Sequence, residues 1–283
     1  DYLVITCVDG PADAKVVRIV GKRPWNDLRI LHYLRKNITD NDVILTGTFH
    51  PDGLLAFLSG HKCYFLGHGA EFLPGEGFFR RILWPHYRRW ILAKPTDNIS
   101  NSHYTAGLIK KCCPNANVTP LPLAVDHVRF RPTKQKYNDG LLHLCSVSRL
   151  EKFKAQDFVI KTISHLPDAY KDRIRFEIAG KGPYKDHLEK LVNDNHLENN
   201  VKFLGFISDD DLCDFYSRND VFILTTREKK NTMEVEGFGL VFTEAQACGT
   251  ACIGSRSGGI PDAIEVGEGG WLIDQDNETQ LKN

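Results

Sequence analysis

Two glutamates near the end of the chain flank a glycine-rich turn. Glu236 and Glu244 lie eight positions apart (244 − 236 = 8) in the segment Glu236-Gly-Phe-Gly-Leu-Val-Phe-Thr-Glu244. The glycines predict a loop at Glu236, and the apolar spacing that follows predicts a helix that contains Glu244. The backbone N–H groups of residues 238–240 would form the N-terminus of this helix, which favours an anion. A carboxylate, an anion site and a second carboxylate on a helix suit a sugar joined to a phosphate.

Two basic residues follow the apolar run 141–147. Arg149 and Lys154 would leave the carboxyl end of a strand and flank the start of the next helix. The arginine fork and the lysine point charge can together hold a diphosphate. Local sequence alone equally allows two solvated loop cations.

Glycines also mark the turn Ile178-Ala-Gly-Lys-Gly-Pro183. Gly180 and Gly182 would allow a ligand to approach the backbone closely, although an ordinary turn explains them equally well. The spacing GxGxxG is absent, so the turn is not a dinucleotide fingerprint.

Two further turns precede predicted helices. In Ser208-Asp-Asp-Asp211 we expect Ser208 to cap a helix whose first turn carries the aspartates, in preference to a metal site. The turn Ser255-Arg-Ser-Gly-Gly-Ile-Pro-Asp262 either faces the phosphates or the sugar, or only starts a helix.

Short apolar runs alternate with amphipathic stretches along the whole chain. In the first half they predict strands at 2–7, 16–20, 42–46, 62–67, 97–100 and 117–120, and helices at 26–37, 52–59, 78–93 and 102–112. In the second half they predict strands at 141–147, 174–179, 200–205, 220–224, 251–254 and 270–273. The helices there are expected at 155–165, 183–195, 208–218, 240–248 and 259–265.

This alternation predicts an α/β protein with two Rossmann-like, doubly wound domains that face a cleft. The Pro-, Gly- and charge-rich stretch 131–140 is typical of a linker. We therefore expect an N-terminal domain at 1–134 and a C-terminal domain at 135–283. Both ends look incomplete, because the first unit lacks a glycine-rich turn after its first strand and residues 277–283 resemble the first turn of a helix.

Composition favours a soluble globular protein, with 42% hydrophobic and 25% charged residues. No run reaches the apolar length of a membrane-spanning helix. The eight cysteines have neither disulfide-framework nor zinc spacing, so we expect buried, reduced thiols.

Charge divides unevenly between the two halves. Residues 1–134 carry 18 basic and 11 acidic residues (18 − 11 = +7), and residues 135–283 carry 18 and 25 (18 − 25 = −7). The basic half would meet an anionic membrane surface or a phosphate-bearing acceptor, since no nucleic-acid motif is present.

Phe78–Trp90 interleaves aromatic residues with four arginines, which fits either an interfacial helix or a helix with one core face and one solvated basic face.

Taken in order and spacing, these motifs resemble glycosyltransferase family 4 over nearly all of 141–275. The resemblance rests on Arg149 with Lys154, on Ala179-Gly-Lys-Gly, on Asn200-Val-Lys-Phe-Leu-Gly-Phe206, and on Glu236 to Glu244 followed by Ala-Cys-Gly-Thr. It implies a retaining, nucleotide-sugar-dependent enzyme of the GT-B fold. Arg149, Lys154 and the amides of residues 237–240 would offset the negative charge of the leaving diphosphate, so we expect no metal or other cofactor.

The resemblance also implies roles for single residues. Arg149 and Lys154 would bind the donor diphosphate, Glu236 would contact the hydroxyls of the donor sugar, and Glu244 would hold the ribose. The backbone of Gly237, Phe238, Gly239 and Leu240 would meet the sugar and the phosphate. The family's usual Lys-Gly is Lys154-Ala155 here, which should leave the phosphate contact in place.

In the first half the resemblance rests on fewer residues. His68, in Cys63-Tyr-Phe-Leu-Gly-His-Gly-Ala-Glu71, would lie near the donor sugar and the reaction centre, and His50 is a weaker cleft residue. The family's Pro-Asn-Gly-Val-Asp has become Pro122-Leu-Ala-Val-Asp126, which puts a donor contact from that loop in doubt.

The expected activity is transfer of a hexose-type sugar from a UDP- or GDP-sugar to a glycan or lipid-linked acceptor, as in polysaccharide or lipopolysaccharide biosynthesis. The location would be cytoplasmic, with peripheral contact to the inner face of the plasma membrane. A nucleotide-sugar epimerase or phosphorylase of similar architecture, and a non-catalytic nucleotide- or carbohydrate-binding module, stay open as alternatives. A phosphorylase would need a pyridoxal lysine, which the sequence does not identify.

Overall fold

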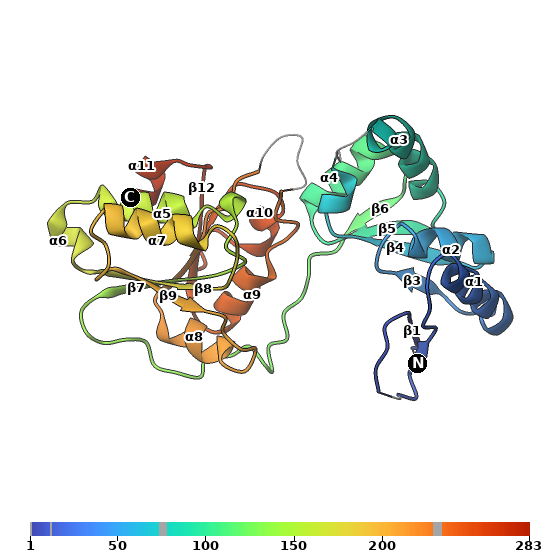
Figure 1. The fold of residues 1–283 in the computed structure, drawn as a ribbon, viewed down its shortest axis with the longest axis horizontal. Coiled ribbons are helices and arrows are strands. Elements are labelled where there is room, and N and C mark those ends of the chain that lie inside the picture. Colours follow the sequence, from blue (N-terminus) through green and yellow to red (C-terminus); the bar gives the residue numbers. More distant parts are fainter. Residues whose placement is uncertain (1, 12, 74–77, 229–233) are drawn as a thin grey trace. The chain divides into compact units, whose positions relative to one another are not determined.

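A computed structural model of the chain describes residues 2–11, 13–73, 78–228 and 234–283, without the side chains of residues 78–81. The chain divides into two compact units. The first contains residues 1–67, 76–100 and 106–120, and the second contains residues 68–75, 101–105 and 121–283. Both are built from parallel sheets with helices between the strands (Figure 1), as the alternating pattern predicts.

The first unit contains a four-stranded parallel sheet in the order β3-β4-β5-β6. These strands are Ile44–Thr46, Cys63–Gly67, Asp97–Ser100 and Val118–Pro120. A separate parallel pair joins β1 (Val4–Thr6) and β2 (Val16–Arg18). The helices are α1 (Trp25–Asn37), α2 (Asp52–Ser59), α3 (Phe78–Leu92) and α4 (His103–Cys112), and the first residues of α4 group with the second unit.

Helix α3 continues through Pro85, and its aromatic side chains pack against other rings of the first unit. The ring of Trp84 lies 5.1 Å from that of His50, and the ring of Trp90 lies 5.6 Å from that of Phe57 on α2, both edge to face. Tyr87 joins the two through ring contacts at 5.1 and 6.0 Å. This face of the helix is therefore a packing face, as the second of the two sequence interpretations expects, whereas Arg88, which that interpretation places on the solvated basic face, is buried. Two of the four arginines, Arg80 and Arg81, lie outside the described side chains.

The second unit contains a six-stranded parallel sheet in the order β12-β11-β10-β7-β8-β9. The strands are β7 (Leu142–Val147), β8 (Ile174–Ala179), β9 (Val201–Gly205), β10 (Val221–Leu224), β11 (Ala251–Ser255) and β12 (Gly270–Ile273). Counted along this unit, the order is 3-2-1-4-5-6, the Rossmann order, and it reverses direction between β7 and β10. Ligands bind at such a switch point, beyond the carboxyl ends of the strands.

Helices cover both faces of this sheet. They are α5 (Gln156–Ser164), α6 (Asp168–Lys171), α7 (Lys185–Asp194), α8 (Leu212–Arg218), α9 (Leu240–Ala247), α10 (Ile260–Ala263) and α11 (Glu278–Lys282), with short 3₁₀ turns at Ala70–Phe72 and Lys152–Lys154.

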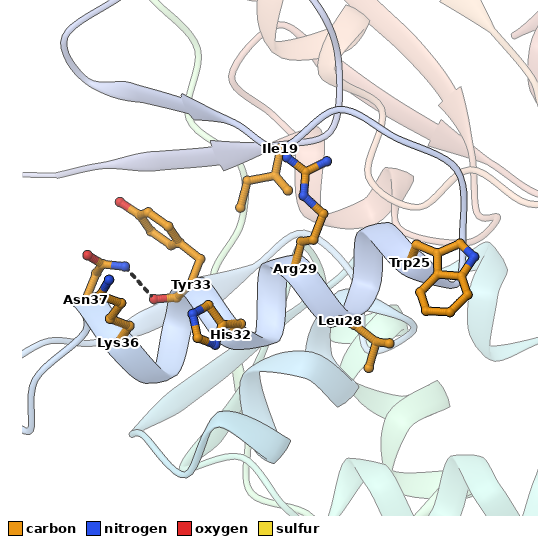
Figure 2. A pocket seen from close by; sticks show the side chains of 8 residues that line it. All are labelled: Ile19, Trp25, Leu28, Arg29, His32, Tyr33, Lys36 and Asn37. Atoms are coloured by element: carbon orange, nitrogen blue, oxygen red, sulfur yellow. Dashed lines mark hydrogen bonds between the residues drawn. The ribbon is translucent and has the colours of Figure 1, made fainter.

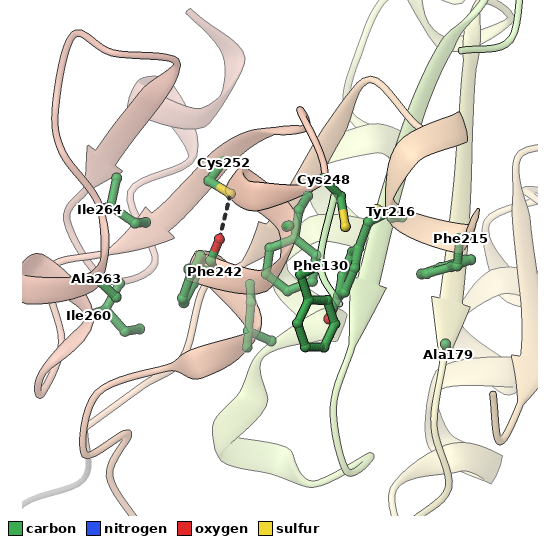
Figure 3. Packing of buried hydrophobic residues seen from close by; sticks show 14 of the residues in the cluster. Phe130, Ala179, Phe215, Tyr216, Phe242, Cys248, Cys252, Ile260, Ala263 and Ile264 are labelled. Carbon is green, nitrogen blue, oxygen red and sulfur yellow. Dashed lines mark hydrogen bonds between the residues drawn. The ribbon is translucent and has the colours of Figure 1, made fainter. Parts of the chain in front are cut away.

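Two large buried clusters lie between the sheet and these helices, beside a small one of Ala155, Phe158 and Ile273. The first joins α8 and α9 to the sheet, and Figure 3 shows Tyr216 and Phe242 within it. In this cluster the ring of Phe222 lies 5.7 Å from that of Tyr216 and 5.2 Å from that of Phe242, both edge to face. The second lies under α5 and α7 and is aliphatic, with Ile160 and Leu188 fully buried. A core on each face makes this unit doubly wound.

Residues 121–134 pack with the second unit, whereas the linker composition predicts a domain boundary at 134. Phe130 belongs to the buried cluster of α8 and α9. Thr133 and Lys136 are bonded to the same helix region, since Thr133 N donates to Ser217 Oγ at 3.1 Å and Lys136 Nζ donates to the Asn219 carbonyl at 2.6 Å. In the structure the long continuous part of the second unit therefore begins at Leu121.

The predicted cap at Ser208 is wrong, because α8 begins only at Leu212 and has no side-chain cap. Ser208 instead closes a turn with Asp211: its carbonyl accepts from Asp211 N at 3.1 Å, and its hydroxyl donates to Asp211 Oδ2 at 2.5 Å. The aspartates therefore precede the helix.

No helix of the described part of the chain combines the length and the apolar character that crossing a bilayer requires.

The loop after β8 gives a test of this fold. Gly180 has a left-handed backbone (φ 130°), and a Cβ there would lie 1.8 Å from the Ser148 carbonyl oxygen. We expect Gly180→Ala to lower the free energy of unfolding in urea by about 3 kcal/mol, since strain and a backbone clash add. Gly205→Ala is the matched control, because φ is also positive (72°) but no atom lies within 4 Å, so about 1 kcal/mol is expected. Equal losses in the two variants would contradict the packing of this loop.

Candidate functional site

A cavity of about 440 Å³ lies at the switch point of the second unit. The end of β7 and the loop after it line one side with Val147, Ser148, Arg149, Glu151, Phe153 and Lys154. The 236–241 segment, which leads into α9, lines the other side. The remaining lining residues are His68, Asn101, Leu123 and Leu224. The order of the strands therefore brings together loops that are far apart in the sequence.

Lys154 and Glu236 meet across this cavity. Lys154 Nζ donates to Glu236 Oε2 at 2.6 Å, and the two side chains are 14% and 18% exposed. Lys154 also lies 4.9 Å from the centre of the Phe153 ring. The pair is partly removed from water, so its attraction is stronger than that of a surface pair.

The backbone after Lys154 turns sharply at Ala155. This residue is fully buried and holds a left-handed conformation (φ 59°, ψ 30°), from which α5 begins. The methyl group packs with Phe158 and Ile273. A left-handed position explains why the family resemblance predicts glycine here.

Arg149 also lines the cavity but differs from Lys154 in its surroundings. Its Nη2 pairs with Glu151 Oε1 at 2.6 Å, and its side chain is 78% exposed. The structure therefore brings the two predicted diphosphate ligands to one cavity, with the lysine shielded and the arginine at the open side.

The segment that carries Glu236 is held by backbone contacts. The Glu236 carbonyl accepts from Gly259 N at 2.8 Å, and the Gly237 carbonyl accepts from Ser102 Oγ at 2.7 Å. A Cβ at Gly237 would lie 1.9 Å from the His68 carbonyl oxygen, so glycine is needed for this approach. Helix α9 then begins at Leu240 after the left-handed Gly239, with its positive dipole end beside the cavity.

Glu244 lies apart from this group and does not line the cavity. Its Oε2 accepts from the hydroxyl of Tyr216 at 3.1 Å. Burial raises the pKa of Glu244 from its ordinary value, and the Tyr216 hydrogen bond opposes this by favouring the ionised form. The two glutamates of the motif therefore point to different places, as the sequence predicts, although the predicted ribose contact of Glu244 stays a prediction.

Gly180 and Gly182 do not line the cavity either. The space above their α-carbons holds the carbonyl oxygens of Ser148 and Leu150, and Leu150 N donates to the Lys181 carbonyl at 3.0 Å. Their close approach is to the chain itself. In this structure they support the loop that carries Arg149.

The two histidines named from the sequence lie in different units. His68 is exposed and lines the cavity, with its backbone N–H donating to Glu71 Oε1 at 2.6 Å and its carbonyl accepting from Asn101 Nδ2 at 3.1 Å. His50 belongs to the first unit, where its Nδ1 meets the Tyr87 hydroxyl at 2.8 Å. Burial and the nearby Arg23 lower the pKa of His50.

Sequence reasoning missed several lining residues, namely Asn101, Leu123, Glu151 and Phe153. Leu123 lies within the segment 122–126 that the family resemblance names, and Asn101 directly follows the strand predicted at 97–100. Their types, an amide after a strand and a leucine after a proline, carried no signal of their own.

Residues 129–283, more than half of the chain, match the family model described as "Glycosyl transferases group 1". The chain belongs to this family. The resemblance inferred from the motifs is thereby confirmed at the level of group 1, whereas membership of family 4 and a retaining mechanism stay predictions. The two loops that carry the charged residues of the cavity, after β7 and before α9, both fall within the matched region.

Curated relatives are named as sugar transferases. A GDP-mannose-dependent alpha-(1-6)-phosphatidylinositol monomannoside mannosyltransferase of Mycobacterium tuberculosis is 32% identical over 169 residues, which cover 57% of this chain and 44% of that protein. The putative colanic acid biosynthesis glycosyltransferase WcaL of Escherichia coli is 27% identical over 241 residues, covering 82% of this chain and 58% of that protein. The chain thus matches less than half the length of the mannosyltransferase.

Solved structures share the fold. Anabaena Alr3699/HepE in complex with UDP and glucose has a TM-score of 0.71 at 17% identity, covering 94% of this chain and 74% of that one. Sucrose-phosphate synthase from Thermosynechococcus elongatus has a TM-score of 0.70 at 17% identity, covering 94% and 71%. The predicted GT-B fold, with two Rossmann-like domains, is confirmed.

The bond between Tyr216 and Glu244 predicts a pH-dependent stability. Tyr216→Phe keeps the buried ring but removes the donor to a carboxylate, so we expect the free energy of unfolding to fall by about 1.5 kcal/mol at pH 7.5. The loss should shrink at pH 4, because a protonated Glu244 gains little from this donor, and its raised pKa widens the pH range in which it is protonated. Urea unfolding at both pH values measures the difference. A loss that is the same at both would show that the ionised carboxylate does not depend on this bond.

Proposed function

We propose that this protein is a retaining glycosyltransferase that moves a hexose-type sugar from a UDP- or GDP-sugar to a glycan or lipid-linked acceptor. One observation carries the proposal: Lys154, Arg149 and Glu236 line a single cavity with the start of α9, at the switch point of a Rossmann-ordered sheet. This set combines positive charge for a diphosphate with a carboxylate for sugar hydroxyls. Family membership supports the reaction class.

The cations would assist departure of the nucleoside diphosphate. Negative charge grows on the leaving phosphate as the bond to the sugar breaks, and preorganised positive groups stabilise that charge. Lys154, Arg149 and the amides of residues 237–240 supply such groups, so the proposed reaction needs no divalent metal. His68 would face the donor sugar from the same cavity, and the acceptor would attack the face from which the diphosphate leaves.

Two relatives guide the choice of donor. The mycobacterial enzyme is named as GDP-mannose-dependent, and the Anabaena structure contains UDP and glucose. We therefore propose GDP-mannose and UDP-glucose as the first donors to try. The alternative of a binding module without catalysis predicts nucleotide binding with no transfer, and an epimerase predicts a changed sugar still attached to the nucleotide.

Removal of either charge of the Lys154–Glu236 pair should abolish most of the activity. We expect Lys154→Ala and Glu236→Ala each to lower kcat/KM for transfer by about 100-fold or more, since each removes a charged contact to the donor in the transition state. Radiolabelled transfer to an acceptor extract measures this, with equal rates expected with and without EDTA. Lys190→Ala is the matched control, because Lys190 pairs with Asp194 on the exposed surface of α7 and should be dispensable. Full activity in both cavity variants would refute the assigned site.

We also propose that the protein works in the cytoplasm and contacts an anionic membrane surface through α1. This helix exposes Trp25 (73%) and Leu28 (57%), and both residues line the pocket drawn in Figure 2. Residues 22–37 contain five basic residues and one acidic residue, Asp27, which pairs with Arg23 at 3.3 Å. Exposed apolar side chains beside an excess of positive charge are typical of interfacial helices.

Vesicle binding tests this surface. The protein should sediment with vesicles of phosphatidylcholine and phosphatidylglycerol and remain in solution with pure phosphatidylcholine, since about 1 kcal/mol per basic residue depends on anionic lipid. Trp25→Ser with Leu28→Ser should lower the bound fraction several-fold. The control is Tyr170→Ser, an exposed aromatic residue of the second unit, which should leave binding unchanged. Equal binding by the α1 variant and the wild type would exclude α1 as the contact.

A further inference from the structure

The two charged residues that the proposed function assigns to different parts of the donor are bonded to each other. Lys154 is assigned to the diphosphate and Glu236 to the sugar hydroxyls, yet Lys154 Nζ donates to Glu236 Oε2 at 2.6 Å. Both side chains are mostly buried, at 14% and 18% exposure. The carboxylate of Glu236 is therefore bonded to Lys154, the same cation that a phosphate of the donor would bind.

An internal carboxylate of this kind competes with an incoming phosphate. A hydrogen bond between two charged groups is stronger where the groups are partly buried than in water. A phosphate that binds Lys154 must therefore offset the loss of the bond between Lys154 and Glu236. Sugar hydroxyls change this balance, because they can donate to Glu236 and replace the lysine as its partner. A nucleoside diphosphate without a sugar has no such hydroxyls to offer at that position.

We propose that Glu236 is a specificity-determining residue that makes the cavity prefer a nucleoside diphosphate sugar over the free nucleoside diphosphate, by competing for Lys154. The complete donor satisfies both partners of the ion pair, one with its sugar and one with its phosphate. The product, a free nucleoside diphosphate, offers a partner only to Lys154. The carboxylate of Glu236 then competes with its phosphate for the lysine and weakens product binding. This inference rests on the proposed function, and it assigns to Glu236 a role in product release as well as in sugar binding.

A second ion pair in the cavity provides an internal comparison. Arg149 and Glu151 also meet at 2.6 Å, but Arg149 is 78% exposed. Water screens an exposed pair, and such pairs contribute little. Both pairs carry the same charges beside the same cavity, so only the shielded one should discriminate between the two ligands.

The test measures the affinity of each protein for UDP, UDP-glucose, GDP and GDP-mannose by isothermal titration calorimetry. Glu236→Gln keeps the shape of the side chain and removes its charge. We expect the variant to bind the preferred free diphosphate about tenfold more tightly than the wild type and to bind the matching sugar nucleotide no more tightly. The preference for the sugar nucleotide should therefore fall by at least that factor.

Two further variants separate competition for Lys154 from a general change of charge. Glu151→Gln removes the same charge from the same cavity, and it should alter the affinities for diphosphate and sugar nucleotide by the same small factor. In a Lys154→Met background the gain from Glu236→Gln should disappear, because the cation for which the two anions compete is gone.

Each outcome decides between the proposals. If the wild type binds none of the four ligands, the proposed function fails and this inference with it. If the wild type binds a donor but Glu236→Gln leaves the affinity for the free diphosphate unchanged or lower, the inference alone is overturned. A gain that persists with Lys154→Met would overturn it as well. Thermal unfolding confirms that each variant is folded, and Glu236→Asp, whose shorter side chain cannot keep the 2.6 Å bond, replaces a glutamine variant that does not fold.

Discussion

The reversal of strand order between β7 and β10 is the constraint on which the candidate site depends. At that point the chain leaves the sheet toward opposite sides, and the loops beyond the two strands face a common space. Lys154 comes from the loop after β7, and Glu236 comes from the long connection between β10 and α9, 82 positions later. The chemistry of the cavity therefore arises from topology, because no local segment contains both charges.

Close backbone contacts convert this topology into a fixed geometry. The carbonyl groups of Glu236 and Gly237 are both bonded, to Gly259 N and Ser102 Oγ, and the missing side chain at Gly237 admits the His68 carbonyl. Gly180 and Gly182 act in the same manner on the other side, where they admit the carbonyls of Ser148 and Leu150. Glycines thus hold both walls of the cavity by letting chain segments touch one another, which keeps the charged side chains at a defined separation.

Much of this arrangement could be predicted from the sequence. The alternation of apolar runs placed nearly every strand and long helix, because periodicity records which face of an element is buried. The separation of Glu236 from Glu244 also followed, since one lies on a loop and the other within a helix. The sequence could not reveal which groups these residues contact. Gly180 and Gly182 make room for the carbonyl groups of the loop after β7, and Ser208 bonds to Asp211 instead of capping a helix. Such choices depend on three-dimensional neighbours that a local pattern does not contain.

Ala155 shows how a demanding backbone position can be filled without glycine. A left-handed alanine costs roughly 1 kcal/mol more than glycine, but its methyl group here is buried against Phe158 and Ile273, which offsets part of that strain. Alanine also leaves the unfolded chain fewer conformations to lose than glycine would. The turn that positions Lys154 is therefore determined by side-chain packing as well as by backbone freedom. The position of the lysine depends on the apolar cluster of Ala155, Phe158 and Ile273.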